Sequence, residues 1–337
     1  MEQPFSSMPD PLRSRELIDL AFRRARKREV KIPRRTPKDL KAKIKEETRI
    51  TSAGNIVINR LHKVVAETPR ISDLHPFYRE VADAVVGVDN LRKALARIKR
   101  AETIVKRLLK DHLRMVKRAR EVHEAARIRK AFYGRLSSVL KKLDKDLALI
   151  KEAGAKLRKL PSIDPEGLTV VVAGAPNVGK SCFVKCVSTA KPDIASYPFT
   201  TRQVLVGHLD LGGVRVQIID TPGLLDRPIY KRNRAEQQAI AALRHLAKSV
   251  IFMIDPSETS GYTIKEQVNI YRGAVEVLKD IPHLPVLNKV DLASERQIKE
   301  VEDELGLRNL PKMVALRCLG VKEVLVEAVK AARRGEG

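Results

Sequence analysis

A glycine-rich octet at residues 174–181 is the stretch whose residue types and spacing most clearly predict chemistry. It reads Gly-Ala-Pro-Asn-Val-Gly-Lys-Ser and fits the pattern G-x-x-x-x-G-K-S. Glycines let the backbone wrap a phosphate with its N–H groups pointing inward, and the dipole of a following helix adds positive potential. Lys180 is expected to bridge the β- and γ-phosphates, and the Ser181 hydroxyl to ligate Mg²⁺. The nucleotide-binding residues predicted here are Gly174, Ala175, Pro176, Asn177, Val178, Gly179, Lys180, Ser181 and Cys182.

Two later motifs supply groups for the γ-phosphate. Asp220-Thr221-Pro222-Gly223 ends an apolar run, which places the Asp220 carboxylate where it can hold Mg²⁺ and the Gly223 N–H where it can meet the γ-phosphate. Residues 196–202 read Ser-Tyr-Pro-Phe-Thr-Thr-Arg, and Thr201 rather than Thr200 is predicted to reach Mg²⁺ and the γ-phosphate. A loop with that contact orders with the triphosphate and relaxes after hydrolysis. The catalytic roles therefore fall to Lys180, Thr201 and Gly223.

The motif Asn288-Lys289-Val290-Asp291 predicts which nucleotide base is bound. The Asp291 carboxylate can accept hydrogen bonds from guanine N1–H and the 2-amino group together, whereas adenine offers neither donor at that edge. The Lys289 stem can lie along the base plane, and Asn288 can tether neighbouring loops. Together with the octet, this motif predicts a P-loop GTPase that binds GTP or GDP with Mg²⁺.

The segments around these motifs have the periodicity of strands and helices. Short apolar runs occur at residues 168–173, 204–211, 214–219, 249–254, 284–287 and 313–316, with a hairpin signal at Gly212-Gly213. Helical stretches separate most of them, which favours a mostly parallel sheet with helices on both faces. Upstream, helical patterns cover residues 13–28, 37–67, 75–86, 91–118 and 131–157, with Asp89 as the expected cap of the long one. The sequence thus predicts a helical bundle of four-helix type at residues 1–160, then a GTPase domain with a short tail at residues 161–337.

Charge is distributed unevenly between these two parts. Residues 1–160 hold 42 Lys and Arg against 20 Asp and Glu, while residues 161–337 hold 24 against 21. This asymmetry indicates a polyanionic partner, RNA above all, for the helical part only. A thermophile surface would also be rich in lysine, but there glutamate normally rises with it.

Cysteines and apolar runs bear on location. Three cysteines are too few for a disulfide framework and lack a metal-ligand pattern, which predicts a reducing, intracellular location. Cys182 and Cys186 are expected to be small core residues rather than a metal or redox pair. No run approaches the ~20 apolar residues of a membrane span, and residues 1–10 have no signal pattern. We expect a soluble monomer with no membrane contact.

The order of these motifs resembles the Obg-related branch of translation-factor-type GTPases. Two stretches are more specific: residues 225–240, from Leu-Asp-Arg-Pro to Arg-Asn-Arg-Ala-Glu-Gln-Gln-Ala-Ile, and residues 255–267, which begin Asp-Pro-Ser-Glu-Thr-Ser-Gly-Tyr. Both are similar to the Nog family, nucleolar GTP-binding proteins that act in assembly of the large ribosomal subunit. The resemblance implies a GTPase that docks on large-subunit rRNA in a pre-ribosomal particle. Because the eukaryotic C-terminal extension is missing, an archaeal-type cytoplasmic member is expected, or a nucleolar one if the source is eukaryotic.

At three places the sequence is compared with the residues that related GTPases carry. Leu224 stands where many small GTPases place a water-orienting glutamine, so intrinsic hydrolysis is expected to be slow. Asn177 matches an asparagine that holds K⁺ in a related branch; the alternative is that it only shapes the loop. The last guanine loop usually carries Ser-Ala, whereas this sequence offers Val314-Ala315-Leu316-Arg317, and Ala315 and Leu316 are taken as the guanine contacts.

Three functions stay open on the sequence. The first is a GTP-switched ribosome-assembly factor anchored on RNA by its basic bundle, with Arg227, Lys231, Arg232 and Arg234 either touching rRNA or solvated. The second is a structural RNA-binding scaffold that binds nucleotide with little turnover. The third, a membrane-surface GTPase, is disfavoured because the apolar stripes carry few aromatic residues and no lipidation motif is present.

Overall fold

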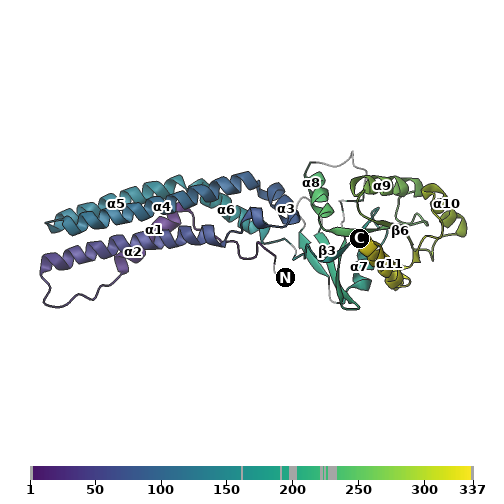
Figure 1. The fold of residues 1–337 in the computed structure, drawn as a ribbon, viewed down its shortest axis with the longest axis horizontal. Helices are drawn as coiled ribbons and strands as arrows, with labels where there is room; N and C mark the ends of the chain where they lie inside the picture. Colours follow the sequence, from purple (N-terminus) through teal and green to yellow (C-terminus); the bar gives the residue numbers. More distant parts are fainter. Residues whose placement is uncertain are drawn as a thin grey trace. The chain divides into compact units, whose positions relative to one another are not determined.

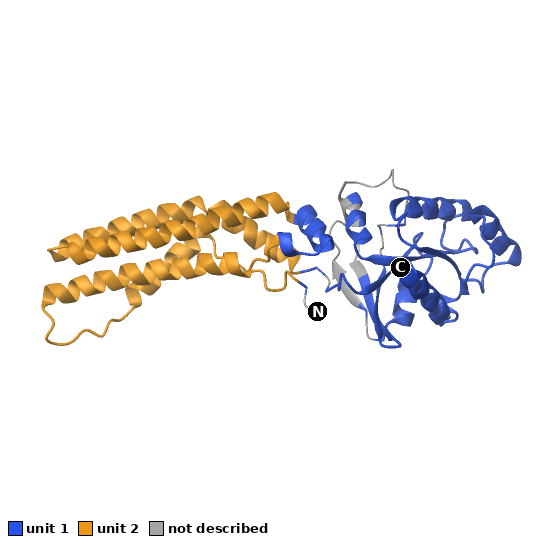
Figure 2. Cartoon of the chain, viewed as in Figure 1, with its two compact units in different colours: residues 1–3, 72–85, 159–337 blue, residues 4–71, 86–158 orange. Residues whose placement is uncertain are grey.

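The computed structural model describes residues 3–160, 162–189, 192–196, 203–220, 223, 225–226 and 234–334. The chain forms two compact units (Figure 2). Residues 4–71 and 86–158 make up the helical unit, and residues 1–3, 72–85 and 159–337 make up the sheet unit. The chain therefore leaves the helical unit at Ser72, returns to it after Val85, and leaves it again after Arg158.

The helical unit is built on long amphipathic helices that run side by side (Figure 1). Its helices are α1 (Ser14–Lys27), α2 (Lys38–Glu67), α4 (Val88–Arg118), α5 (Val122–Lys142) and α6 (Asp144–Leu157). In α4 the buried side chains recur every three or four residues, as in Leu91, Ala94 and Ile98, which makes one apolar stripe. Ile50 and Leu61 of α2 are fully buried in the same core.

The expected helical bundle is confirmed, with three differences of detail. The pattern at residues 131–157 belongs to two helices, because the chain turns at Leu143 between α5 and α6. The bundle has five helices in its described residues rather than four. Asp89 is not the cap of α4: Gly87, at φ 70°, precedes the helix, and Asp89 lies in its first turn, where the helix dipole favours a negative charge.

Most of the acidic side chains buried in the helical unit are paired with basic ones. Glu46 of α2 accepts hydrogen bonds from Arg49 at 2.7 Å and from Arg129 of α5. Asp146 of α6 accepts from Arg97 of α4 at 2.7 Å. A buried carboxylate without such a partner would be costly. The few buried acids are thus paired within the helical unit, and most of its Lys and Arg side chains remain on the surface.

The sheet unit contains a seven-stranded sheet in the order β2-β3-β4-β1-β5-β6-β7. The strands are β1 (Leu168–Gly174), β2 (Asp193–Ser196), β3 (Gln203–Leu211), β4 (Val214–Asp220), β5 (Ala247–Ile254), β6 (His283–Asn288) and β7 (Lys312–Met313). The pairs β2/β3 and β3/β4 are antiparallel, and all the others are parallel. The mostly parallel sheet is therefore confirmed, as is the hairpin at Gly212 (φ 61°) and Gly213 (φ 83°).

Helices cover both faces of this sheet (Figure 1). On one face, α7 (Lys180–Val187) and α11 (Val321–Arg334) pack together. On the other face, α9 (Ile264–Val277) packs against β1 and β5, and α10 (Glu295–Leu305) packs against α9. The sequence did not predict β2. It also placed a strand at residues 313–316, where β7 ends at Met313 and a 3₁₀ turn follows at Ala315–Arg317.

Helix α3 (Pro76–Val86) lies between α2 and α4 in the sequence, but residues 72–85 belong to the sheet unit. The Tyr78 hydroxyl donates to the Ile163 carbonyl at 2.6 Å, and burial raises the pKa of Tyr78 to about 12. Glu80 meets His245 at 3.0 Å, directly after α8 (Arg234–Arg244). These contacts hold α3 in the unit that carries the octet.

Candidate nucleotide site

The octet, Asp220, Asp255 and Asn288 all lie at the carboxyl ends of neighbouring strands. β1 occupies the middle of the sheet between β4 and β5, and β6 is next to β5. Parallel strands bring their carboxyl ends to the same edge, which in open α/β sheets is where ligands bind. The topology therefore assembles residues that are more than 100 positions apart in the sequence.

The octet has the backbone of a phosphate-binding loop. Gly174 has φ 137° and Gly179 has φ 104°, conformations that only glycine adopts readily, and α7 begins at Lys180. A Cβ on Gly179 would also collide with the side-chain amide of Asn288. Asn177 adopts the left-handed conformation (φ 62°) and is exposed, which fits its loop-shaping role. The K⁺ role of Asn177 stays a prediction.

Lys180 is buried against the loop that it follows. Its Nζ donates to the Gly174 carbonyl at 2.9 Å and to the Ala175 carbonyl at 2.8 Å, and the side chain is 7% exposed. These carbonyls keep the ammonium group hydrogen-bonded at the mouth of the loop. Phosphate oxygens can take over the same role with full negative charge, which is the stronger kind of hydrogen bond.

Ser181 and Asp220, the two predicted Mg²⁺ ligands in the described residues, meet directly. The Ser181 hydroxyl donates to Asp220 Oδ2 at 2.7 Å. Asp220 is 1% exposed, and its Oδ1 is buried with no hydrogen-bond partner among the residues that the structure describes. Burial raises the pKa of Asp220, because a charged carboxylate is poorly solvated there. A divalent cation would satisfy the orphaned oxygen and favour the charged form, so this pair fits Mg²⁺.

The Gly223 N–H, predicted to meet the γ-phosphate, is engaged elsewhere in this structure. It donates to Asp226 Oδ2 at 2.9 Å, and Asp226 is 6% exposed. Asp226 thus holds the donor with a carboxylate in place of a phosphate oxygen. Thr201, Leu224 and the basic residues Arg227, Lys231 and Arg232 lie outside the described residues, and so does the side chain of Arg234.

Asn288 joins the octet to the last guanine loop. Its Nδ2 donates to the Val178 carbonyl at 2.7 Å, and its Oδ1 accepts from the Ala315 N–H at 2.8 Å. The Ala315 N–H is therefore used inside the protein. Among the described residues, the Leu316 N–H has no acceptor, which makes it the better candidate donor to guanine O6.

Lys289 and Asp291 are both held by charged neighbours. Lys289 Nζ donates to Asp255 Oδ2 at 2.8 Å and to Thr259 Oγ1 at 3.0 Å. Burial acts to raise the pKa of Asp255, but hydrogen bonds from Lys289 and Ser257 outweigh it and the pKa is lowered. Asp291 lies 3.9 Å from Arg317 across the mouth of the site. The role of Asp291 as acceptor for guanine N1–H stays a prediction.

A disulfide joins Cys186 of α7 to Cys318, directly after the loop with Ala315 and Leu316. The prediction that Cys186 is simply a small core residue was wrong. The fold brings the two cysteines to a Cα separation of 5.7 Å from 132 residues apart, which spacing alone could not reveal. Cys182, in the first turn of α7 where its N–H can face a phosphate, is a free, half-buried thiol.

Comparison with known proteins identifies the family. Residues 5–164 match the NOG1 N-terminal helical domain, and residues 234–291 match nucleolar GTP-binding protein 1. The chain is 39% identical to the uncharacterized protein MJ1408 of Methanocaldococcus jannaschii over 88% of its own length and 83% of that protein's. It belongs to the Nog family.

Other relatives carry the family name. Nucleolar GTP-binding protein 1 of Encephalitozoon cuniculi is 33% identical over 96% of this chain, which spans 60% of that protein. A solved Plasmodium falciparum structure of the same name is 36% identical over 52% of this chain and 92% of that one, with a TM-score of 0.45. Within the described ranges of this Nog-family chain, no helix has the length and apolar character needed to cross a membrane.

Asp226, Asp255 and Thr259 are the site residues that motif spacing missed. They lie in the two stretches by which the sequence resembles the Nog family, residues 225–240 and 255–267. Each acts by holding another group: Asp226 the Gly223 N–H, and Asp255 with Thr259 the Lys289 ammonium. The only sequence signal for them was that resemblance, because an isolated aspartate has no pattern of its own.

Substituting Asp226→Ala is expected to raise the ratio of GTP to GDP affinity about fivefold. The reason is that the Gly223 N–H no longer has to give up a hydrogen bond of about 1 kcal/mol before it can reach the γ-phosphate. Titration with a non-hydrolysable GTP analogue and with GDP measures the ratio. Asp210→Ala is the matched control, because Asp210 holds Gly213 N–H at 2.7 Å in the same way in the β3–β4 turn. An unchanged ratio in Asp226→Ala would contradict this role.

Proposed function

We propose that this chain binds guanine nucleotide, hydrolyses GTP slowly, and uses the cycle to time its docking on large-subunit rRNA during ribosome assembly. The observation that carries the proposal is the meeting of three motifs at one sheet edge. Ser181 contacts Asp220, and Asn288 bonds both the octet and the loop that precedes Arg317. Family membership supports the same function, because relatives are named nucleolar GTP-binding protein 1.

Binding begins with exchange of hydrogen bonds that the structure already holds. The Lys180 ammonium leaves the Gly174 and Ala175 carbonyls for the β- and γ-phosphate oxygens. At the other end, Asp291 accepts from N1–H and the 2-amino group of guanine, and the Lys289 stem, held by Asp255, lies along the base. Adenine would leave Asp291 without these donors, and the cost of that loss sets the selectivity.

Hydrolysis proceeds by in-line attack of water on the γ-phosphate. Mg²⁺, held by Ser181, Asp220 and Thr201, would neutralise charge on the phosphate oxygens. Lys180 stabilises the same charge, and the Gly223 N–H, once released by Asp226, donates to a γ-phosphate oxygen. Leu224 cannot orient or polarise the attacking water, so turnover is slow until a partner supplies help.

The helical unit supplies the RNA contact in this proposal. Residues 4–71 and 86–158 contain 40 Lys and Arg against 16 Asp and Glu. Such an excess attracts a polyanion and predicts binding that weakens steeply with salt. Helix α3 offers the route for coupling: it bonds His245 after α8 and Ile163 before β1, while its chain neighbours α2 and α4 belong to the helical unit. We place such a chain in the cytoplasm if it is archaeal-type and in the nucleolus if it is eukaryotic.

Single-turnover GTP hydrolysis should accelerate at least tenfold when large-subunit rRNA is added. Leu224 cannot orient the attacking water, and we expect docking on RNA to order the groups that take over this role. Phosphate release from a preloaded GTP complex measures the rate. Lys180→Ala sets the background, and heparin at equal charge controls for a non-specific polyanion effect. A rate that rRNA leaves unmoved would contradict the timer and favour a structural RNA-binding scaffold with bound nucleotide.

A further inference from the structure

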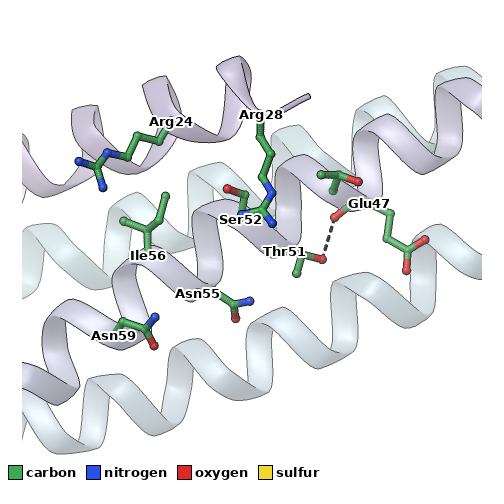
Figure 3. A pocket seen from close by; sticks show the side chains of 9 residues that line it. Arg24, Arg28, Glu47, Thr51, Ser52, Asn55, Ile56 and Asn59 are labelled. Atoms are coloured by element: carbon green, nitrogen blue, oxygen red, sulfur yellow. Dashed lines mark hydrogen bonds between the residues drawn. The ribbon is translucent and has the colours of Figure 1, made fainter. Parts of the chain in front are cut away.

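A polar groove of about 680 Å³ lies between α1 and α2 in the helical unit (Figure 3). Its lining comes from the last turn of α1 and from one face of α2. The lining residues are Arg24, Arg28, Glu47, Thr48, Thr51, Ser52, Asn55, Ile56 and Asn59. All of them lie in a single compact unit, and the groove opens to solvent.

The groove is lined by hydrogen-bonding groups where two packed helices would normally share apolar ones. Thr48, Ser52, Asn55 and Asn59 recur at spacings of three and four, so they share one face of α2. Ile56 is the single apolar residue among the lining side chains. Elsewhere α1 and α2 bury apolar side chains such as Leu17 and Val57.

Several of these groups have no partner within the described part of the chain. Arg24, Arg28, Asn55 and Asn59 make neither a hydrogen bond nor an ion pair there, and Ser52 is 7% exposed without a hydrogen bond. The Thr51 hydroxyl donates to the Glu47 carbonyl at 2.9 Å, which leaves its oxygen free to accept (Figure 3). The groove thus presents two cations with amide and hydroxyl groups between them.

The surroundings of the groove are strongly basic. Residues 23–45 run from the last turns of α1 into α2 and contain 12 Lys and Arg against two Asp and Glu. The one acid of the groove, Glu47, lies 4.0 Å from Lys117 of α4. Arg24 lies in the last turn of α1 and Arg28 directly follows the helix, so the two can contact successive phosphates of one strand.

We propose that this groove binds a segment of RNA backbone, with phosphates on Arg24 and Arg28 and ribose 2′-hydroxyls on Asn55, Asn59 and Ser52. This inference rests on the proposed docking of the helical unit on RNA. Amide and hydroxyl groups can both donate to and accept from a 2′-hydroxyl, which is the group that separates RNA from DNA. A membrane surface would require an apolar face, and the groove offers only Ile56.

Fluorescence anisotropy with the full chain tests the groove. The probes are a labelled single-stranded RNA of about 16 nucleotides and the DNA of the same sequence. The double variant Arg24→Ala/Arg28→Ala should bind the RNA at least tenfold more weakly and lower the salt slope by about 1.4. The control Arg92→Ala/Arg100→Ala removes the same charge from exposed positions of α4 and should lose less than threefold. Circular dichroism melting checks that both variants fold.

The amides make a second, independent prediction. Asn55→Ala/Asn59→Ala should reduce the preference for RNA over DNA at least fivefold and leave the salt slope unchanged, since no charge is removed. Equal losses of RNA affinity in the two arginine double variants would overturn the proposal that the groove is the RNA-binding site. The helical unit would then attract RNA only through its overall positive charge. If the unaltered chain binds no RNA, large-subunit rRNA included, the proposed docking itself fails.

The disulfide carries a separate inference, which rests on the proposed binding of guanine nucleotide. It joins α7, which begins at the phosphate loop, to the loop that presents the Leu316 N–H. Within the described residues that loop is also held by the Asn288 bond to Ala315, by the pairing of Val314 with Leu319 and by the Arg317–Asp291 ion pair. Cys318 is exposed, so a thiol in solution can reach its sulfur.

We infer that the Cys186–Cys318 disulfide slows nucleotide release while it is oxidised, and we call this role a redox tie. A dithiol reductant attacks the exposed Cys318 sulfur, and Cys186 leaves as a thiolate and is protonated. The second thiol of the reductant then displaces Cys318, so two protein thiols and one reductant disulfide result. The freed loop keeps the Asn288 bond, its own pairing and the Arg317–Asp291 contact but loses its covalent link to α7, so guanine leaves faster.

Release of a fluorescent methylanthraniloyl-GDP measures this effect. The rate should rise at least threefold after reduction with a dithiol, and Cys318→Ser and Cys186→Ser should release at the fast rate with or without reductant. Thiol alkylation with mass spectrometry establishes the disulfide in the oxidised protein. Alkylation of Cys186 and Cys318 as well as Cys182 in that protein, or equal release rates in the two states, would overturn the redox tie. Failure to bind GDP in either state would instead contradict the proposed nucleotide site.

Discussion

The side chain of Asn288 is the interaction on which the nucleotide site depends. One amide group donates to the Val178 carbonyl in the phosphate loop and accepts from the Ala315 N–H in the guanine loop. Asn288 is 2% exposed, so leaving either group unpaired would cost about 1–3 kcal/mol. The same amide occupies the space that a Cβ on Gly179 would need, which explains why a glycine stands there. One buried contact therefore ties the octet to the loop that carries Ala315 and Leu316.

Several other contacts in the site are reserved for a ligand. Lys180 donates to two carbonyls and the Gly223 N–H donates to Asp226, while one buried oxygen of Asp220 has no partner among the described residues. Each group could bond a different part of the Mg²⁺–triphosphate complex that we propose as the ligand. A site of this kind changes its internal bonds when the γ-phosphate arrives or leaves, which is the physical requirement for a switch.

Much of the fold and part of the site could be predicted from the sequence. The octet, Asp220 and Asn288 were found because their chemistry needs fixed residue types next to strand ends, and strand and helix periodicity supplied those ends. Asp226, Asp255 and the Cys186–Cys318 disulfide were not found by spacing, because their roles arise from tertiary contacts. The assignment of residues 72–85 to the sheet unit could not be predicted either, because α3 has an ordinary helical pattern. Its tertiary hydrogen bonds to Ile163 and His245 are what join it to the sheet unit.

Calorimetric titration of the chain with GDP, IDP and ADP in Mg²⁺ tests the central claim most directly. IDP lacks only the 2-amino group that Asp291 would read, and ADP lacks that group, the N1–H and the O6 that the Leu316 N–H would meet. The account predicts that GDP binds on the order of 10⁴-fold more tightly than ADP, with IDP, which lacks the 2-amino group, in between. It also predicts that Asn288→Ala weakens GDP binding as a whole, since both loops lose their tie. Equal affinity for GDP and ADP would contradict the account.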